Sequence, residues 1–335
     1  MVTRVALTGF GRIGRLTLRG IVESKRKDIK IVALNASGSI DTAAHLLQYD
    51  TVHGRYEGKI KTTKSSMDLG SGPFKVFTER DPAKLPWGDL GVDVVLECTG
   101  AFNSKEASMA HIEAGAKKVL ISAPASNVDN TIVYGVNHKS LRKSHKIVSN
   151  ASCTTNALAP LAMVLDDLCG IKSGYMTTIH AYTGDQRLVD NRHKDMRRAR
   201  GAAQSMIPTS TGAAKALGLV LPKLAGKLDG TAIRVPTPNV SLVDLVFTPQ
   251  KKTTIDAIHD AMKKASRGKL KGILGYEDAP LVSTDFNHQP FSCTYDATGT
   301  QIVGNNLVRV MCWYDNEWGF SLRMADTAVA MHKLG

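Results

Sequence analysis

Short apolar runs alternate with longer segments of helical spacing along the first half of the chain. The runs are rich in Val, Ile and Leu, which predicts buried strands, whereas apolar residues that recur at helical spacing predict amphipathic helices. Strands that alternate with helices are typical of a doubly wound parallel sheet. The predicted strands span 4–8, 29–34, 73–77, 92–98, 118–122 and 131–136, and the predicted helices span 15–24 and 105–114.

The second half has a different pattern, in which strands follow one another with fewer helices between them. This pattern is typical of an α+β domain with a mostly antiparallel sheet and helices on one face. Because 335 residues are too many for one ordinary core, two domains are expected. The predicted helices span 154–168, a segment ending at 221, 255–266 and 316–334. The predicted strands span 174–179, 281–284, 291–296 and 308–314, and 231–247 is expected to form long strands broken by Pro236 and Pro238.

The composition is that of a basic globular protein, with a formal net charge of +13 and 43% hydrophobic residues. Excess positive charge attracts phosphorylated metabolites, nucleotides and nucleic acid. The basic residues are spread along the chain without a recognised nucleic-acid-binding module, so no dedicated nucleic-acid partner is expected. A basic nucleic-acid or scaffold protein on this fold is kept as an alternative, and it predicts binding that weakens steeply with salt.

The cysteines indicate a reducing compartment. They are five in number, and no two are spaced as Cys-x-x-Cys. The first residues lead directly into a predicted strand without a basic and apolar leader, and no apolar run has the length of a membrane span. We therefore expect a cytoplasmic protein with no membrane partner and no metal site.

A glycine-rich turn directly follows the first predicted strand and precedes the first predicted helix. In this context Gly-x-Gly-x-x-Gly predicts a dinucleotide site. Gly9 permits the tight turn, Gly11 lets the backbone approach a pyrophosphate, and Gly14 lets the helix pack closely on the strand. Arg12 and Ile13 would offer backbone N–H groups at the start of the helix.

The second predicted strand ends without the acidic residue that binds the adenosine ribose of NAD. The sequence there reads Asn35, Ala36 and Ser37. Loss of the carboxylate removes an acceptor for the 2′-hydroxyl and a charge that would repel a 2′-phosphate. This favours NADP as the cofactor. A neutral loop variation in an enzyme that uses NAD is the alternative, and acceptance of both cofactors stays open.

Cys153 lies where a β-branched strand ends and a predicted helix begins. Backbone N–H groups and the positive end of the helix dipole favour a thiolate at such a position. The neighbouring hydroxyls of Ser152 and Thr154 could bind an anion beside the sulfur. We expect Cys153 to be a nucleophile. The alternative is a buried cysteine that packs the start of the helix.

His180 ends the strand predicted at 174–179 and is the expected partner of Cys153. An imidazole can accept a proton near neutral pH and can stabilise a thiolate as an imidazolium. A structural histidine is the alternative for this residue. A thiol hydrolase is a further alternative for the protein, and the glycine turn argues against it because hydrolysis of an ester needs no dinucleotide.

The stretch SNASCTTN around Cys153 resembles the active-site signature of the phosphorylating glyceraldehyde-3-phosphate dehydrogenase family. The resemblance extends from the glycine turn to residues 313–317, nearly the whole chain. It implies a Rossmann-type dinucleotide-binding domain over 1–151, a catalytic domain over 152–316, and a C-terminal helix over 317–335 that packs back on the first domain.

The resemblance also implies roles for further residues. Arg192 lies in a basic loop over 187–200, and in the family this loop reaches from one subunit toward the neighbour's cofactor. There Arg192 could provide positive charge for a 2′-phosphate. The other cofactor positions implied are Arg80, Thr99, Gly100, Ser122 and Asn316. The substrate phosphate would be bound by Thr183, Arg198 and Arg234, and the attacking phosphate by Ser152, Thr154, Thr211 and Gly212.

The reaction implied by the resemblance is the reversible oxidation of glyceraldehyde 3-phosphate to 1,3-bisphosphoglycerate with inorganic phosphate. It would proceed through a thiohemiacetal and a thioester on Cys153. The resemblance further implies a homotetramer that works in glycolysis or gluconeogenesis. A sister enzyme that oxidises erythrose 4-phosphate shares the signature and is kept as the alternative.

Overall fold

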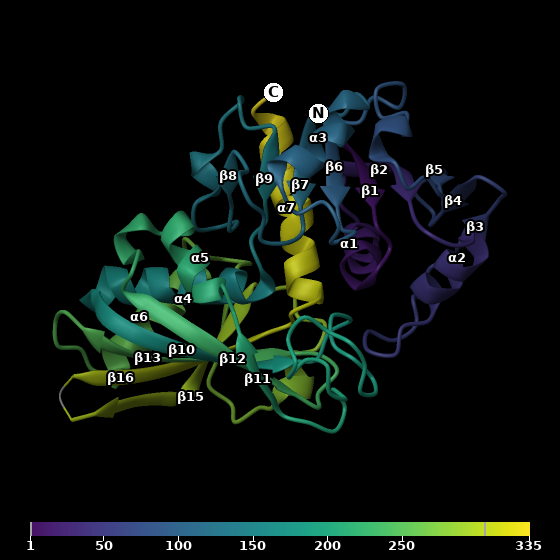
Figure 1. Cartoon of the computed structure of the whole chain (residues 1–335). Coiled ribbons are helices and arrows are strands. Elements are labelled where there is room, and N and C mark those ends of the chain that lie inside the picture. Colours follow the sequence, from purple (N-terminus) through teal and green to yellow (C-terminus); the bar gives the residue numbers. More distant parts are fainter. Residues whose placement is uncertain (1, 305) are drawn as a thin grey trace. The chain divides into compact units, whose positions relative to one another are not determined.

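The computed structural model describes residues 2–304 and 306–335. The chain divides into two compact units, one made of Met1–Ser152 with Phe320–Gly335 and the other of Cys153–Gly319. Each unit has its own sheet and its own helices (Figure 1). No helix in the described part of the chain combines the length and the apolar character needed to cross a bilayer.

The sheet of the first unit has the strand order β3-β4-β5-β2-β1-β6-β7-β9-β8, with the bounds given below. Its pairs from β5 through to β8 are parallel, and the pairs that involve β4 are antiparallel. Strand order reverses at β1, and such a switch point is where doubly wound sheets bind ligands. The strands are β1 (Thr3–Thr8), β2 (Ile29–Asn35), β3 (Lys61–Thr62), β4 (Ser66–Asp68), β5 (Phe74–Phe77), β6 (Val94–Glu97), β7 (Lys118–Ile121), β8 (Asn130–Thr131) and β9 (Ile147–Ser149).

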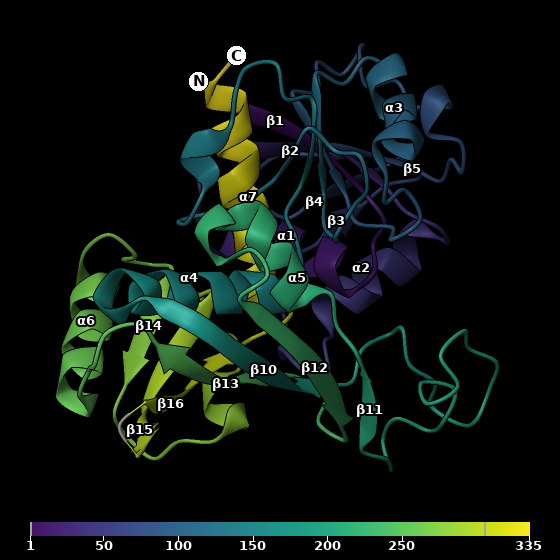
Figure 2. The same cartoon turned by 60° about the vertical axis from the view of Figure 1, so that its left-hand side comes forward.

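Helices α1 (Arg12–Glu23), α2 (Ile40–Gln48) and α3 (Lys105–Glu113) connect the strands of this sheet. The last helix, α7 (Trp318–Lys333), supplies Phe320–Gly335 to the same unit. In Figures 1 and 2 its yellow ribbon runs beside α1. Lys118 Nζ donates to Met331 O at 2.6 Å, and Thr327 Oγ1 donates to Asn150 Oδ1 at 2.8 Å, which ties this helix to β7 and to the end of β9.

The second unit contains a seven-stranded sheet in the order β11-β12-β10-β13-β16-β15-β14. Most of its neighbouring strands are antiparallel, while β10 with β12 and β14 with β15 are parallel. The predicted fold class is therefore confirmed. The strands are β10 (Ile171–Ala181), β11 (Ile207–Ser210), β12 (Leu228–Val235), β13 (Ser241–Pro249), β14 (Leu274–Glu277), β15 (Cys293–Val303) and β16 (Leu307–Tyr314), and the helices are α4 (Cys153–Cys169), α5 (Ala213–Val220) and α6 (Ile255–Arg267).

Alternating burial along β13 explains why this sheet has one covered face. Every second residue from Ser241 to Pro249 is buried, which is the pattern of a strand with one face in a core. Helices α4 and α6 cover that face (Figure 2). In the parallel pair β10 and β12, His180 lies opposite Arg234, so two predicted site residues are neighbours by register.

Two predicted strands are wrong. Residues 131–136 were expected to form a strand, but β8 ends at Thr131 because a turn follows, with Gly135 at a φ of 90°. Residues 281–284 overlap a short 3-10 helix, Ser283–Phe286, in which the Asp285 carboxylate accepts from the N–H of Val282 at 2.8 Å. The spacing also missed the short strands β11 and β14 and helix α2.

Leu245 tests the core of the second unit. It is fully buried in the central strand β13, so Leu245→Ala leaves a cavity and should lower the free energy of unfolding by about 2–5 kcal/mol. Leu219 is 65% exposed, and Leu219→Ala should change this free energy by less than about 0.5 kcal/mol. Urea unfolding followed by tryptophan fluorescence measures both. Equal losses in the two variants would contradict this description of the core.

Candidate functional site

Cys153 is the first residue of α4, directly after a sharp turn that ends β9. Ala151 has a φ of 57°, which an L-residue adopts rarely and only where its surroundings hold it. Ser149 provides part of that support, because its Oγ accepts the N–H of Ala151 at 3.0 Å and donates to Ala123 O at 2.7 Å. The strand, turn and helix expected around Cys153 are all present.

His180 lies beside the cysteine. Its Nε2 is 3.5 Å from Cys153 Sγ, within the range of a hydrogen bond to sulfur. The other ring nitrogen, Nδ1, is 2.6 Å from Ala181 O and 3.0 Å from Arg234 Nη1. Ala181 O can only accept and Arg234 Nη1 can only donate, so Nδ1 meets partners of both kinds. A proton on Nδ1 serves the shorter of the two contacts, to Ala181 O, and leaves the lone pair of Nε2 directed at the thiol. This tautomer can accept the thiol proton.

Burial works against charge on either group alone. It raises the pKa of the Cys153 thiol, while Arg234 and the hydroxyl and N–H of Thr154 act in the opposite direction. Burial also lowers the pKa of His180 to about 3, and the charge of Arg234 adds to that effect. The helix start was expected to favour a thiolate, and its N–H groups do lower the pKa of Cys153, but burial outweighs them. A thiolate and an imidazolium are favoured when they form together, because each charge then compensates the other.

Tyr314 holds the two reactive groups in place. Its hydroxyl is 2.9 Å from Thr154 Oγ1 and 2.8 Å from Thr178 Oγ1, so it joins the first turn of α4 to β10. Its ring packs edge-on against His180 with 5.9 Å between ring centroids. Burial raises the pKa of Tyr314, which keeps the hydroxyl protonated. Sequence reasoning missed this residue and its contact with Thr154.

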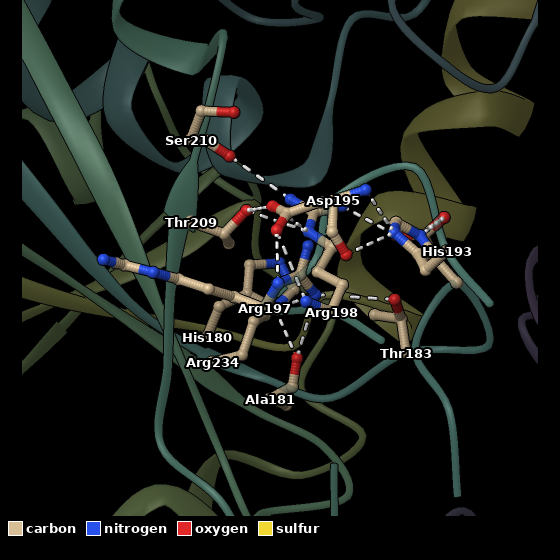
Figure 3. A network of polar contacts seen from close by, with 11 residues as sticks. His180, Ala181, Thr183, His193, Asp195, Arg197, Arg198, Thr209, Ser210 and Arg234 are labelled. Carbon is tan, nitrogen blue, oxygen red and sulfur yellow. Dashed lines mark hydrogen bonds and ion pairs between the residues drawn. The ribbon is translucent and has the colours of Figure 1, made fainter. Parts of the chain in front are cut away.

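Two guanidinium groups lie in the same network (Figure 3). Arg234 Nη1 donates to Ala181 O at 3.1 Å and to Thr183 Oγ1 at 3.4 Å. The charge of Arg198 lowers the pKa of both His180 and Arg234, so the two arginines repel each other. Paired cations beside a hydroxyl form a site for an anion. The structure thus brings together Thr183, Arg198 and Arg234, the three residues that the family resemblance implied for the substrate phosphate, and their binding of phosphate stays a prediction.

Arg198 is held in place by three neighbours. Its Nη1 donates to Asp185 Oδ2 at 2.7 Å, its Nε to Thr209 Oγ1 at 3.0 Å, and its Nη2 to Ser210 O at 3.2 Å. Thr209 in turn donates to Asp195 Oδ2 at 2.6 Å (Figure 3). Sequence reasoning missed both aspartates. Their fixed carboxylates orient a guanidinium that would otherwise be mobile at the edge of the sheet.

The contacts in the structure give less support to the second predicted anion site, which consists of Ser152, Thr154, Thr211 and Gly212. Thr211 and Gly212 precede α5, and Thr211 Oγ1 accepts the N–H of Ala213 at 3.2 Å. Thr154 is buried, with its hydroxyl at Tyr314. Ser152 is half-buried and directly precedes Cys153. No hydrogen bond within the described residues joins the turn at Thr211 to the cysteine, so the grouping of these four residues stays a prediction.

Asn316 is connected to the strand that carries His180. Its Oδ1 accepts from Ser241 Oγ at 2.8 Å, and Ser241 Oγ accepts the N–H of Ala181 at 3.0 Å. Asn316 is buried, which fixes its amide group. This chain of hydrogen bonds places the amide at a set position relative to the imidazole, as a residue that orients a cofactor ring requires.

In the first unit, the glycine turn has the conformation that a dinucleotide site needs. Gly9 has a φ of 83°, and a Cβ there would lie 2.5 Å from Thr99 N. A Cβ on Gly14 would overlap Gly9 O, whereas one on Gly11 would meet no atom within 4 Å. The backbone at Gly11, at the start of α1, is thus open to the close approach that a phosphate group needs. The side chain of Arg12 is bound to Asp50, with Arg12 Nη2 donating to Asp50 Oδ1 at 3.1 Å.

The end of β2 also has features of a nucleotide site. Asn35 Nδ2 donates to Glu79 O at 2.9 Å, and its Oδ1 accepts the N–H of Glu79 at 3.0 Å, so Asn35 fixes the segment that carries Arg80. Ala36 is buried, while Ser37 and Arg80 are exposed. Asn35 thus positions Arg80 through the backbone of Glu79. Ser37 and Arg80 are the residues exposed to a ligand.

Thr99 and Gly100 follow β6 and are exposed at the end of this strand, next to the switch point of the sheet. Gly100 has a φ of 74°, which turns the chain sharply there. Ser122 is half-buried on the neighbouring strand end, and its N–H donates to Glu97 O at 2.9 Å. The buried carboxylate of Glu97 accepts the N–H of Thr99 at 2.7 Å. Sequence reasoning missed Glu97. The signal that could have indicated it is a charged residue at the end of an otherwise apolar strand.

The basic loop lines an open, shallow pocket of about 800 Å³ in the second unit. Arg192 is exposed at this pocket and forms no ion pair within the described residues. Its guanidinium is available to an anion. The residues that line the pocket are Gly184, Asp185, Arg187, Arg192, His193, Lys194 and Ala199.

Two family models match the chain. The model described as glyceraldehyde 3-phosphate dehydrogenase, NAD binding domain, matches residues 3–105. The model described as glyceraldehyde 3-phosphate dehydrogenase, C-terminal domain, matches residues 152–316. The first match includes the glycine turn, and the second includes Cys153, His180 and the two arginines.

Similar proteins named glyceraldehyde-3-phosphate dehydrogenase come from several bacteria. The one from Xanthobacter flavus is 59% identical over 100% of both chains, and the one from Cereibacter sphaeroides is 57% identical over 100% of both. A third, from Bacillus subtilis, is 51% identical over 97% of this chain and 96% of its own. Fold and matches define an oxidoreductase that uses a nicotinamide dinucleotide. The chain belongs to the glyceraldehyde-3-phosphate dehydrogenase family.

Arg234 sets the protonation of the reactive pair. Its positive charge lowers the pKa of both Cys153 and His180, so Arg234→Gln should raise both values. The rate of Cys153 alkylation by iodoacetamide, measured against pH, should therefore shift toward higher pH. Arg197→Gln is the control, because the guanidinium of Arg197 is exposed and contacts only Pro208 O, at 3.5 Å, among the described residues. A profile that stays in place in Arg234→Gln would refute this electrostatic role.

Proposed function

We propose that the protein oxidises glyceraldehyde 3-phosphate to 1,3-bisphosphoglycerate in the presence of inorganic phosphate, with Cys153 as nucleophile and His180 as general base. The contact of 3.5 Å between Cys153 Sγ and His180 Nε2 is the observation that carries the proposal. In this proposal residues 1–151 bind the dinucleotide, residues 152–316 carry the catalytic groups, and residues 317–335 close the first domain.

The protons can be followed through each step. Cys153 Sγ forms a bond to the aldehyde carbon while its proton passes to His180, and His180 then gives this proton to the aldehyde oxygen, which becomes the hydroxyl of a thiohemiacetal. His180 then removes the hydroxyl proton as the carbon is oxidised to a thioester. When bound, the dinucleotide supplies the two-electron acceptor for this oxidation. An oxygen of inorganic phosphate attacks the thioester, the C–S bond breaks, and the sulfur leaves as a thiolate that can take back the proton held by His180.

Two anion sites are needed for this reaction. Arg198, Arg234 and Thr183 would bind the phosphate of the substrate, and their position beside His180 supports this role. The hydroxyls and backbone N–H groups of Ser152, Thr154, Thr211 and Gly212 would bind the attacking phosphate. Asn316 would hold the carboxamide of the cofactor ring, and so would fix which ring face meets the substrate.

NADP is the cofactor that the polar groups favour. Ala36 provides neither an acceptor for a ribose hydroxyl nor a charge that would repel a phosphate. Ser37, Arg80 and Arg192 are exposed and can donate to a 2′-phosphate. Acceptance of NAD as a second cofactor is compatible with the same residues, because Ala36 and Ser37 are small and leave room for a ribose that carries no phosphate.

The proposed assembly is a homotetramer in the cytoplasm, working in glycolysis or gluconeogenesis. Four large apolar side chains on and next to the basic loop are 74–85% exposed, which is costly unless a second copy covers them. They are Leu188, Val189, Met196 and Met206. The five cysteines are unbridged, which suits a reducing compartment.

Removal of the nucleophile tests the proposed chemistry. Cys153→Ser should lower the phosphate-dependent reduction of NADP by more than about 10³-fold, because a serine hydroxyl is a far weaker nucleophile. His180→Asn should lower it by about 10²–10⁴-fold through loss of the base. Absorbance at the wavelength of the reduced cofactor measures both.

Cys169→Ser is the matched control for this measurement. Cys169 lies at the far end of α4 and is buried, so this variant should keep the activity of the unaltered chain. Normal turnover in Cys153→Ser would overturn the proposal. Faster turnover of erythrose 4-phosphate than of glyceraldehyde 3-phosphate by the unaltered chain would assign the protein to the alternative activity.

Cofactor choice is tested by a double substitution. Ala36→Asp with Arg192→Pro restores a carboxylate and removes a cation, so the ratio of kcat/KM for NADP over that for NAD should fall. Steady-state kinetics with both cofactors measures the ratio. Lys194→Pro with Ala36→Asp is a control, since it alters the loop backbone but keeps Arg192. An unchanged ratio in the first double variant would refute the assignment of these residues to the 2′-phosphate.

A further inference from the structure

The carboxylate of Glu97 is buried at the end of β6 and accepts hydrogen bonds at both oxygens. It is 1% exposed. Its Oε1 accepts the N–H of Thr99 at 2.7 Å and also the Thr99 hydroxyl. Its Oε2 accepts from Thr8 Oγ1 at 2.7 Å and meets His111 Nε2 at 3.1 Å. Within the described residues, no lysine or arginine forms an ion pair with it.

Trp87 determines which groups donate and which accept in this hydrogen-bond network. Its indole Nε1 can only donate, and it lies 3.1 Å from His111 Nδ1, which must therefore accept. The single proton of a neutral imidazole is then on Nε2, where it is donated to Glu97. A doubly protonated ring would set two donors against each other at Trp87. Four donors thus meet the Glu97 carboxylate, two at each oxygen.

Thr99 is the exposed end of this buried network. The N–H and the hydroxyl of Thr99 both donate to the Glu97 carboxylate, and Thr99 Oγ1 accepts the N–H of Ala101 at 3.0 Å. Asn103 Nδ2 donates to Gly100 O at 2.8 Å, so the rest of the turn is also held. The glycine turn packs on the same segment, since a Cβ at Gly9 would lie 2.5 Å from Thr99 N.

We propose that Glu97 is a positioning residue for dinucleotide binding, with His111 and Trp87 fixing its orientation. Glu97 holds Thr99 and Gly100 in one conformation before the ligand arrives, so binding does not have to order this turn. The proposal rests on the proposed function to the extent that Thr99 and Gly100 contact the dinucleotide. Glu97 itself is too deeply buried to touch the ligand.

Glutamine cannot replace Glu97 in this network. An amide has one accepting oxygen and one donating NH₂ group, whereas the carboxylate accepts at both positions. If the NH₂ group faces Thr99, it meets a backbone N–H that cannot turn. If it faces His111, the ring must move its proton to Nδ1, where Trp87 already donates. Either arrangement leaves a donor unpaired and releases the turn at Thr99.

The test measures dinucleotide affinity rather than activity. We expect Glu97→Gln to raise the Kd for NADP, measured by titration calorimetry, by about 10- to 100-fold, the range for loss of a hydrogen bond to a charged group. Hydrogen exchange at the Thr99 amide should become faster. The alkylation rate of Cys153 without dinucleotide should stay unchanged, because that residue belongs to the other unit.

A second substitution separates positioning from stability. With Trp87→Phe, the ring of His111 can carry its proton on Nδ1 and accept from a glutamine at position 97. Trp87→Phe with Glu97→Gln should therefore bind NADP more tightly than Glu97→Gln alone, although the loss of a fully buried indole lowers the unfolding midpoint further. A merely structural role predicts that the double variant is worse in both measurements.

Leu85→Val is the matched control, because Leu85 belongs to the same core cluster as Trp87 and is apolar. It should lower the unfolding midpoint and leave the Kd for NADP unchanged. An unchanged Kd in Glu97→Gln, or a double variant that binds more weakly than Glu97→Gln, would overturn the inference about Glu97. Failure of the unaltered chain to bind either NADP or NAD would instead contradict the proposed function.

Discussion

The contact between Cys153 and His180 depends on a balance of opposing electrostatic effects. Burial disfavours charge on each group, and the cation of Arg234 favours a thiolate while it disfavours an imidazolium. The carbonyl oxygen of Ala181 acts in the other direction, because it accepts a hydrogen bond at 2.6 Å from the ring nitrogen that faces away from the sulfur. Proton transfer within the pair is therefore easier than ionisation of either member, and the chemistry of the site follows from that difference.

The parts of the site that could be predicted from the sequence have local causes. A short β-branched run followed by a helical spacing placed Cys153 at the start of a helix, and its turn is held by Ser149, only four residues earlier. Gly9 was recognised because a strand and a helix flank it, and its φ of 83° depends on its own lack of a side chain. Such features depend on residues that are close in the sequence, so they can be predicted from the sequence alone.

The parts that could not be predicted depend on residues far apart in the sequence. Tyr314 meets Thr154 across 160 positions, and neither residue type indicates the other. The environment of His180 is of the same kind, since the burial that lowers its pKa comes from several elements and is not visible in the residues around it. The strand expected at 131–136 failed for a related reason, because burial of an apolar run does not require that its backbone join a ladder.

The parallel pairing of β10 with β12 also limits how the chain can vary. His180 and Arg234 are opposite each other in this ladder, and the connection between the two strands includes the basic loop, β11 and α5. Insertions in that connection leave the two side chains aligned, so the loop can acquire new specificities during evolution. One residue added within either strand would turn the following side chains to the opposite face and separate the imidazole from the guanidinium.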